Sequence, residues 1–288
     1  MTVYILPIPD ALRPSAQPFQ YPKHNADYGV EQDFYEYATR RTDLFTKNPE
    51  QAEWHYLPAY WTRWHLNHDY GRQGVDELQR LVDGVVCDDE KTFAICQYDD
   101  GPLVNLGKTS LFLASRKSAE GLDIPLLSSP HRKPFWLPGK RYTASFAGRI
   151  DTHPVRRRML ESLSKRSDIA IVDGDRGARY FVRLTLASYS ALAPRGYGGS
   201  SFRFFEAMQL GVVPILIGDI DTRPFKQFID WASCSFYVDE PAALPELLDS
   251  VDRPTLLNMG KRAAEIYRDH IAFGKWCGYV IRELEQFA

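Results

Sequence analysis

Residues 193–217 constrain the fold more than any other part of the chain. They contain the end of an apolar strand, a glycine-rich loop, a helix that begins at Ser200 and a second apolar strand at 212–217. A strand, a helix and a strand in this order predict parallel strands joined by a crossover helix. The second strand is apolar throughout, which is typical of a parallel sheet covered on both faces. The segment therefore predicts an α/β fold.

The loop between this strand and this helix has the composition of an anion site. Gly196, Gly198 and Gly199 can adopt positive φ angles and let the backbone come close to a ligand. The helix start at Ser200 and Ser201 offers unpaired N–H groups and a partial positive charge, which favour a phosphate. We therefore expect a phosphate-bearing ligand at this loop.

Three charged side chains extend the pattern. Arg195 lies in the loop, while Arg203 and Glu206 lie three residues apart and share one face of the helix. Arginine suits the phosphates of a nucleotide sugar, and glutamate suits its ribose hydroxyls. The alternative is an ordinary strand–helix turn with a surface ion pair between Arg203 and Glu206.

The same residues resemble a family signature. The exostosin-like glycosyltransferases, glycosyltransferase family 47, carry a pattern of roughly C-P-R-G, a few residues, S-x-R-x-x-E-A and G-x-x-P-V-I-I. This chain departs from it at Ala193, where the family often has cysteine. It matches it with Pro194-Arg195-Gly196, Ser201-x-Arg203-x-x-Glu206-Ala207 and Gly211-x-x-Pro214. Residues 145–149, 224–225 and 229–231 resemble further family segments, and a looser likeness reaches back to residue 44.

The resemblance implies a fold and an activity. The fold is GT-B, two Rossmann-like α/β domains that face a central cleft. The activity is that of an inverting glycosyltransferase, which moves a sugar from a UDP-linked donor to a hydroxyl of a glycan acceptor. The resemblance implies that Arg149, Arg195 and Arg203 hold the diphosphate and that Glu206 holds the ribose, with no metal and no cofactor beyond the nucleotide-sugar donor. A non-catalytic glycan- or nucleotide-binding module derived from a transferase is the alternative.

An inverting transfer also needs a base, because the acceptor hydroxyl must lose its proton. Asp99 follows an expected strand at 92–96 and is the best match to the family's aspartate; its alternative is a turn-forming role before Gly101. His68 and Asp69 are the other candidates, in an aromatic-rich segment that could form a platform for the acceptor sugar. The segment His65-x-x-His68-Asp69 could also bind a metal, but the sequence shows no further ligand at the spacing of a metal site.

Three further motifs resemble sites of other kinds. Residues 101–109 are similar to a P-loop but have five intervening residues where the motif needs four. Two D-x-D triplets, 173–175 and 219–221, match the metal-binding pattern of the other large glycosyltransferase fold. Such triplets are common in loops, so a retaining or metal-dependent transferase is only an alternative, and we expect Asp219 to help shape the donor pocket.

The 288 residues are enough for two domains. A proline- and glycine-rich stretch at 128–140 marks the boundary between them. We expect an acceptor-side Rossmann-like domain at 1–135, a donor-binding Rossmann-like domain at 136–272, and a C-terminal helix at 273–288 that crosses back to the first domain. Expected strands are 3–6, 54–57, 92–96, 111–114, 143–148, 169–172, 189–193, 212–217 and 235–238. Expected helices are 30–45, 72–83, 154–166, 200–210, 223–230, 242–249 and 254–272.

Composition and charge limit the classes of molecule that the chain can bind and the compartments in which we expect it. A net charge of −2 gives no general attraction to polyanions, which argues against nucleic acid, and we expect only one arginine of the basic run 156–158 to face the site. No apolar run approaches the ~20 residues of a membrane span, and residues 1–10 do not resemble a signal peptide. Four cysteines without framework spacing favour buried thiols in a reducing compartment. We therefore expect a soluble, cytoplasmic, bacterial or viral family member, of open oligomeric state.

Overall fold

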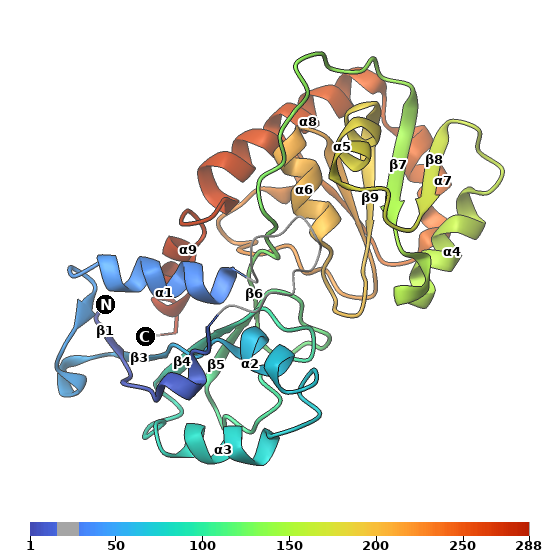
Figure 1. Cartoon of the computed structure of the whole chain (residues 1–288). Helices are drawn as coiled ribbons and strands as arrows, with labels where there is room; N and C mark the ends of the chain where they lie inside the picture. The colour runs from blue at the N-terminus through green and yellow to red at the C-terminus, as the bar shows by residue number, and fades with distance from the viewer. Residues whose placement is uncertain (16–28, 288) are drawn as a thin grey trace. The chain divides into compact units, whose positions relative to one another are not determined.

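The computed structural model describes residues 1–15 and 29–287, and it divides the chain into two compact α/β units (Figure 1). The first comprises Met1–Pro125 with Phe273–Ala288, and the second comprises Leu126–Ala272. Each unit has its own parallel sheet, which confirms the predicted α/β class with two Rossmann-like domains. The second unit begins ten residues before the expected boundary because the first residues of this stretch pack on it; the N–H of His131, for example, donates to Gln209.

The first unit is built on a six-stranded parallel sheet of order β2-β1-β3-β4-β5-β6. Strands β3 and β4 lie in its middle and are buried on both faces. The strands are β1 (Val3–Ile5), β2 (Phe45–Thr46), β3 (Trp54–Leu57), β4 (Thr92–Cys96), β5 (Ser110–Leu113) and β6 (Leu122–Asp123). The helices are α1 (Val30–Arg40), α2 (Trp61–Asn67), α3 (Val75–Asp83) and α9 (Cys277–Leu284).

Alternation along β3 and β4 sorts their side chains into two cores. Tyr56 and its register partner Phe93 stack at 5.2 Å and meet Phe34 of α1. Leu57 and its partner Ala94 point to the opposite face, where they join the apolar residues of α2 and α3. Both faces of this sheet are therefore covered, as its apolar strands predict.

The C-terminal segment completes the first of these cores. The side chain of Trp276 packs 5.8 Å from the ring of Phe34, and its Nε1 donates to Oδ2 of Asp33 (2.7 Å). The backbone N–H of Gly274 donates to the same oxygen (2.7 Å). Burial raises the pKa of Asp33, and these hydrogen bonds oppose the shift. α9 thus belongs to the first unit although it follows the second in the chain.

The second unit is built on a five-stranded parallel sheet of order β11-β10-β9-β7-β8. All five of its predicted strands are confirmed: β7 (Tyr142–Gly148), β8 (Ile169–Asp173), β9 (Ser188–Pro194), β10 (Val213–Ile217) and β11 (Phe236–Val238). Its helices are α4 (Pro154–Leu163), α5 (Ala178–Leu186), α6 (Phe202–Leu210), α7 (Leu244–Ser250) and α8 (Arg253–Ile266). A π-helical turn, Tyr267–Ile271, extends α8.

Some local predictions are wrong. Residues 223–230 form a turn and not a helix, because the buried Phe225 adopts a positive φ of 55° that a helix does not allow. α2, α5 and the short edge strands β2 and β6 were not predicted. Cys87 is exposed, whereas Cys96, Cys234 and Cys277 are buried; all four are free thiols. No helix in residues 1–15 and 29–287 is both long and apolar enough to cross a bilayer.

Candidate active site

The candidate donor site lies where the strand order of the second sheet reverses. β8 lies on one side of β7, whereas β9 returns to the other side. Open α/β sheets bind ligands at such a reversal, at the carboxyl ends of the strands. Residues 149–153 leave β7 here, and residues 195–201 leave β9 and lead into α6. Both loops contain residues predicted to bind the donor.

Arg156 ties these two loops together. This buried residue of α4 donates from its guanidinium to the carbonyl oxygens of Arg149 (2.6 Å), Pro194 (3.1 Å) and Arg195 (2.9 Å). A Cβ at Gly196 would lie 3.1 Å from Nη2 of Arg156, so glycine permits this close approach. As expected for the run 156–158, only one arginine faces the site, because the two that follow Arg156 are exposed.

The glycines of the loop therefore serve close packing. The positive φ angles predicted for Gly196, Gly198 and Gly199 are wrong. Within residues 1–15 and 29–287, glycines with positive φ lie elsewhere, for example at Gly174 (85°) and Gly211 (77°). Gly211 ends α6 in the left-handed conformation, and Gly198 and Gly199 are buried in the loop.

Arg195 is buried beneath the loop. Its Nε donates to the carbonyl oxygen of Gly198 (3.1 Å), and its Nη1 bonds the carboxylate of Asp219, two residues after β10. Burial favours a raised pKa for Asp219, but its hydrogen bond and ion pair with Arg195 outweigh burial and lower that pKa. Arg195 therefore maintains the shape of the loop, and a carboxylate balances its charge.

Arg203 and Glu206 share one face of α6, as predicted. They also form the ion pair of the alternative interpretation, but Glu206 is not on the surface. Nη1 of Arg203 bonds Oε2 of Glu206, whose side chain has no exposed area. Nε of Arg203 donates to the carbonyl oxygen of Ala147 in β7 (2.8 Å), and the guanidinium lies 4.4 Å from the ring centroid of Phe181 in α5. α6 is thereby joined to the end of β7.

Residues 128–131, near the start of the loop that leads to β7, cover the second oxygen of Glu206. Oε1 lies 2.9 Å from Nε2 of His131 and 3.4 Å from Oγ of Ser128. A carboxylate can only accept, so Nε2 of His131 carries the proton in this bond. The backbone N–H of His131 donates to Oε1 of Gln209 (2.7 Å) and fixes the segment on α6. A ligand hydroxyl can reach Glu206 only after His131 moves.

The remaining predicted donor residues border these two loops. Arg149 is exposed at the end of β7. Ser201 is the N-cap residue of α6, and Ser200 is buried beside it. The side chain of Ser201 makes no capping hydrogen bond to this helix. Helix starts of this kind bind anions through their first N–H groups.

The D-x-D triplets are engaged in other contacts. Asp221 pairs with Arg223 (2.8 Å) and Lys226 (3.4 Å). Asp173 accepts from the backbone N–H of Ile150 (2.9 Å). Among residues 1–15 and 29–287, no three His, Cys, Asp or Glu side chains are placed to hold one metal ion.

The candidate bases lie at the carboxyl edge of the first sheet. Asp99 is half-buried in the turn after β4, which the N–H of Gly101 closes by donating to the carbonyl oxygen of Tyr98 (3.0 Å). The hydroxyl of Tyr98 donates to the carbonyl oxygen of Tyr70 (2.9 Å). This bond places the turn beside residues 68–70, so the structure brings the predicted candidates onto neighbouring loops of one edge.

Their surroundings differ. The ring of His68 stacks on Trp64 (3.7 Å, 10°), and its Nδ1 lies 2.7 Å from the carbonyl oxygen of Trp64. Because a carbonyl only accepts, Nδ1 carries the proton and Nε2 of the neutral ring keeps a lone pair. Asp69 is exposed in a left-handed conformation, 3.8 Å from Arg72. His65 is buried, and burial lowers its pKa to about 4, so its ring is neutral at pH 7.

The comparisons with known proteins show the family of the chain. The family model of the exostosin GT47 domain matches residues 96–251, more than half of the chain. The chain belongs to the exostosin GT47 family. It is 38% identical over 98 residues to an Exostosin-1 homolog of Caenorhabditis elegans, which covers 33% of this chain and 26% of that protein. It is 39% identical over 62 residues to Exostosin-1 of Drosophila melanogaster, 21% of this chain and 8% of that protein. The matches thus span about a quarter or less of these relatives.

Among solved structures, the chain is similar to TarM at 10% identity and a TM-score of 0.39, covering 74% of this chain and 57% of TarM. It is likewise similar to a point mutant of S. aureus TarM in complex with Fondaparinux, alpha-GlcNAc-glycerol and UDP, at 10% identity and a TM-score of 0.37, covering 71% and 57%.

The exostosin GT47 match contains both predicted loops of the second unit and, in the first unit, Asp99; His68 and Asp69 lie outside it. It also contains three residues whose contacts sequence reasoning missed: Arg156, His131 and Phe181. The only sequence signals for them were the basic run at 156–158 and the proline-rich stretch at 128–140. Neither signal indicates which residue each side chain contacts, because the contacted residue lies on another helix, strand or loop.

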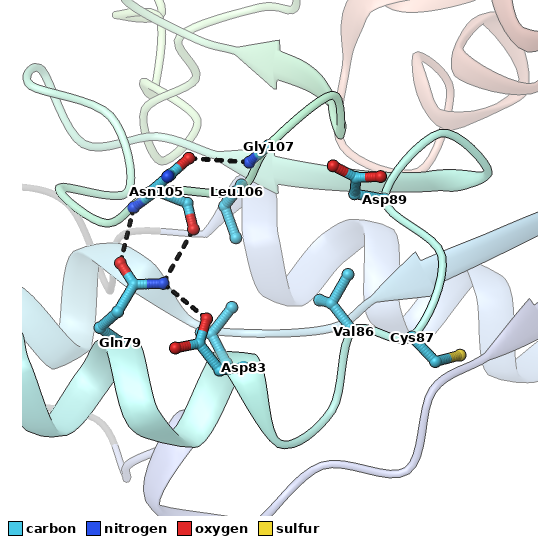
Figure 2. Close-up of a pocket in the computed structure, with 9 residues that line it drawn as sticks. Gln79, Asp83, Val86, Cys87, Asp89, Asn105, Leu106 and Gly107 are labelled. Carbon is cyan, nitrogen blue, oxygen red and sulfur yellow. Dashed lines mark hydrogen bonds between the residues drawn. The ribbon is translucent and has the colours of Figure 1, made fainter.

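A separate pocket of about 610 Å³ lies at the opposite edge of the first sheet (Figure 2). Its walls come from α3 and from the loops that lead into β4 and β5, and Gln79 bridges Asn105 and Asp83 across it. Gly107 of the P-loop-like segment lies in this wall. That segment leads into the strand β5, whereas a P-loop leads into a helix, so the structure does not support a P-loop. None of the predicted site residues of the exostosin family lines this pocket.

Proposed function

We propose that this chain transfers a sugar from a UDP-linked donor to a hydroxyl of a glycan acceptor, with inversion at the anomeric carbon and without a metal ion. The observation that carries the proposal is the Arg203–Glu206 pair of α6, which lies at the strand-order reversal of the second sheet and inside the exostosin GT47 domain. The inverting course and the uridine nucleotide rest on the family resemblance.

The proposed donor site contains an exposed arginine and two arginines that already bond other residues of the chain. Arg149 is exposed and is therefore available to a diphosphate from solution. Arg203 already balances Glu206, and a diphosphate would share its guanidinium, whose Nη2 takes part in none of the bonds described above. Arg195 acts indirectly, because its bonds to Gly198 and Asp219 hold the loop in place. The first N–H groups of α6 would add charge-assisted bonds to the leaving diphosphate.

Glu206 is the proposed ribose contact, and His131 regulates access to it. The carboxylate has no exposed area, so a ribose hydroxyl must replace the His131 bond at Oε1. The ribose hydroxyl would donate a hydrogen bond to Glu206 in place of the imidazole of His131. The carboxylate would keep a hydrogen-bond donor, so the exchange leaves no unpaired buried charge. The pair with Arg203 is retained during this exchange.

Asp99 is our proposed base, since it lies inside the family domain at the end of a buried strand. His68 is the second candidate, because its bond to Trp64 leaves Nε2 as a proton acceptor. Parallel assays of Asp99→Asn, His68→Gln and Asp69→Asn separate these roles. Loss of the base should lower kcat by at least about 100-fold with little change in the KM for the donor.

The decisive experiment compares Arg203→Ala with Arg158→Ala, an exposed arginine of the same unit. UDP binding is measured by calorimetry, and transfer is measured with UDP-sugars and oligosaccharide acceptors. We expect Arg203→Ala to lose transfer and to bind UDP at least about tenfold more weakly, because it lacks a charge-assisted contact. Arg158→Ala should match wild type in both assays. Wild-type transfer by Arg203→Ala would overturn the proposal.

Two outcomes distinguish the alternatives. UDP-sugar binding without transfer or donor hydrolysis in the wild type would indicate a non-catalytic binding module. Loss of transfer on addition of EDTA, or a product that retains the donor's anomeric configuration, would indicate a metal-dependent or retaining enzyme. The paired aspartates at 219 and 221 argue against the metal-dependent course, since both are engaged by basic side chains.

A further inference from the structure

The most exposed large apolar side chains of the described residues stand next to one another. Phe135 is 90% exposed, Trp136 is 82% exposed and Leu137 is 65% exposed. They lie in the loop between β6 and β7, drawn as a green stretch in Figure 1, and we call these three exposed residues the tip. Three adjacent apolar residues in water are unfavourable, and a patch of this kind marks an interaction surface. The proposed donor site does not use them.

The loop holds this tip away from the body of the unit. Before the tip, the N–H of His131 donates to Gln209 (2.7 Å). After it, the N–H of Arg141 donates to the carbonyl oxygen of Ala187 (2.7 Å). Pro134 and Pro138 flank the three apolar residues and restrict the backbone between these anchors. The exposure of the tip is thus a property of an anchored loop.

The charge along this loop has one sign. Residues 124–150 contain five lysines and arginines and no aspartate or glutamate, although the whole chain has a net charge of −2. Arg132, Lys133 and Arg141 are exposed beside the tip. Aromatic side chains favour the membrane–water interface, and lysine and arginine are attracted to anionic lipid headgroups. Apolar insertion and basic attraction are together the two signals of reversible membrane binding.

We propose that residues 132–141 dock the second unit on a lipid bilayer with anionic headgroups: Phe135, Trp136 and Leu137 insert at the headgroup level, and the flanking cations contact the phosphates. The tip precedes β7, so it lies at the amino edge of the sheet. The loops of the proposed donor site leave the carboxyl edge. Docking therefore leaves that site open to solution.

Two other occupants fit less well. A sugar-stacking platform needs a flat aromatic surface, but the rings of Phe135 and Trp136 are perpendicular (5.1 Å, 89°), and the third residue is Leu137. A second copy of this chain, related by a two-fold axis, would bring the same positive charges together. The bilayer is the occupant whose charge complements the loop.

The sequence provides a built-in fluorescence probe. All six tryptophans lie in the described residues, and five of them, at positions 54, 61, 64, 231 and 276, are buried. A blue shift of the emission on addition of vesicles therefore reports Trp136. The test uses the intact chain with vesicles of phosphatidylcholine alone and with about a third phosphatidylglycerol, read by fluorescence and by co-sedimentation.

We expect a blue shift and co-sedimentation with the anionic vesicles and weaker binding to phosphatidylcholine. Phe135→Ser/Leu137→Ser keeps the probe and should lower the partition coefficient by at least about tenfold. Arg132→Glu/Arg141→Glu should remove the preference for anionic lipid. Leu257→Ser, which removes another exposed apolar side chain of this unit, should bind as wild type does.

Three results would overturn the proposal. The first is no emission shift with either vesicle. The second is unchanged vesicle binding by Phe135→Ser/Leu137→Ser, provided that its melting temperature equals that of wild type. The third is an emission shift that occurs without lipid, either on raising the protein concentration, which indicates a second copy, or on adding soluble oligosaccharides.

Discussion

Replacing Arg156 with alanine should destabilise the second unit more than any other single change in the basic run. The buried guanidinium makes three hydrogen bonds of 2.6 to 3.1 Å to carbonyl oxygens at the ends of β7 and β9. Hydrogen bonds to charged groups contribute about 1.5–3 kcal/mol each, but water will reach part of the vacated space and the three are not additive. We therefore expect the free energy of unfolding to fall by about 3 kcal/mol, which corresponds to a melting temperature lower by roughly 6–12 °C for a unit of this size.

The neighbouring residues provide the matched controls. Arg157→Ala and Arg158→Ala remove exposed arginines from the same helix, with partners Asp151 and Glu240 that are also largely exposed, and should change the free energy of unfolding by less than about 0.5 kcal/mol. Arg156→Lys should recover less than half of the loss, because an ammonium group cannot span three carbonyls. Scanning calorimetry and urea unfolding measure all four variants. An Arg156→Ala melting temperature within about 2 °C of that of Arg157→Ala would show that the hydrogen bonds of Arg156 do not stabilise the loops.

Three further predictions concern buried side chains. His131→Ala should tighten UDP binding by a few-fold because it uncovers Glu206, and calorimetry that shows weaker binding would contradict the gating role. Burial raises the pKa of Glu31 to about 8, so this group favours the native state below the unfolded pKa of 4.5 and loses that contribution as pH rises toward 8. Glu31→Gln should therefore flatten the decline in unfolding free energy between about pH 5 and 8; an equal slope in both proteins would refute this. Burial lowers the pKa of His65 to about 4, so stability should fall as pH drops from 6.5 to 4, and His65→Phe should reduce that loss in acid unfolding.

Most elements of the second unit could be predicted from the sequence because its strands are apolar, and the central strands β9 and β10 are almost completely buried. The same reasoning missed α5, whose stripe of Phe181, Val182, Thr185 and Leu186 runs into β9 with no glycine or proline between the two elements. It also assigned a helix to residues 223–230, where Phe225 has a positive φ. Local patterns indicate an element well when turn residues separate it from the next, and α5 lacks that separation from β9.

The candidate site shows a similar division. Spacing alone predicted that Arg203 and Glu206 share a helix face, and they do. Their burial could not be predicted, because His131 and Ser128 lie 75 and 78 residues before Glu206. Likewise Arg195 meets Asp219 across 24 residues. A residue's chemistry is visible in the sequence, whereas the partner that covers or neutralises it depends on which loops the sheet brings together.

The strand order of both sheets explains why the donor is assigned to the second unit. The first sheet also reverses, between β1 and β3, and α2 begins just beyond that point. There, however, the side-chain carboxyl oxygens of Glu31 accept from the N–H of Thr62 in the first turn of α2 (3.2 Å), from its hydroxyl (2.9 Å) and from the N–H of Gln97 (2.9 Å). A helix start that already holds a buried acidic side chain has no place for a diphosphate. At the reversal of the second sheet, the side chain of the N-cap residue Ser201 makes no capping hydrogen bond, and Arg203 lies in the first turn of α6. Of these two reversals it is therefore the second that combines amide donors with a cation for an anionic ligand.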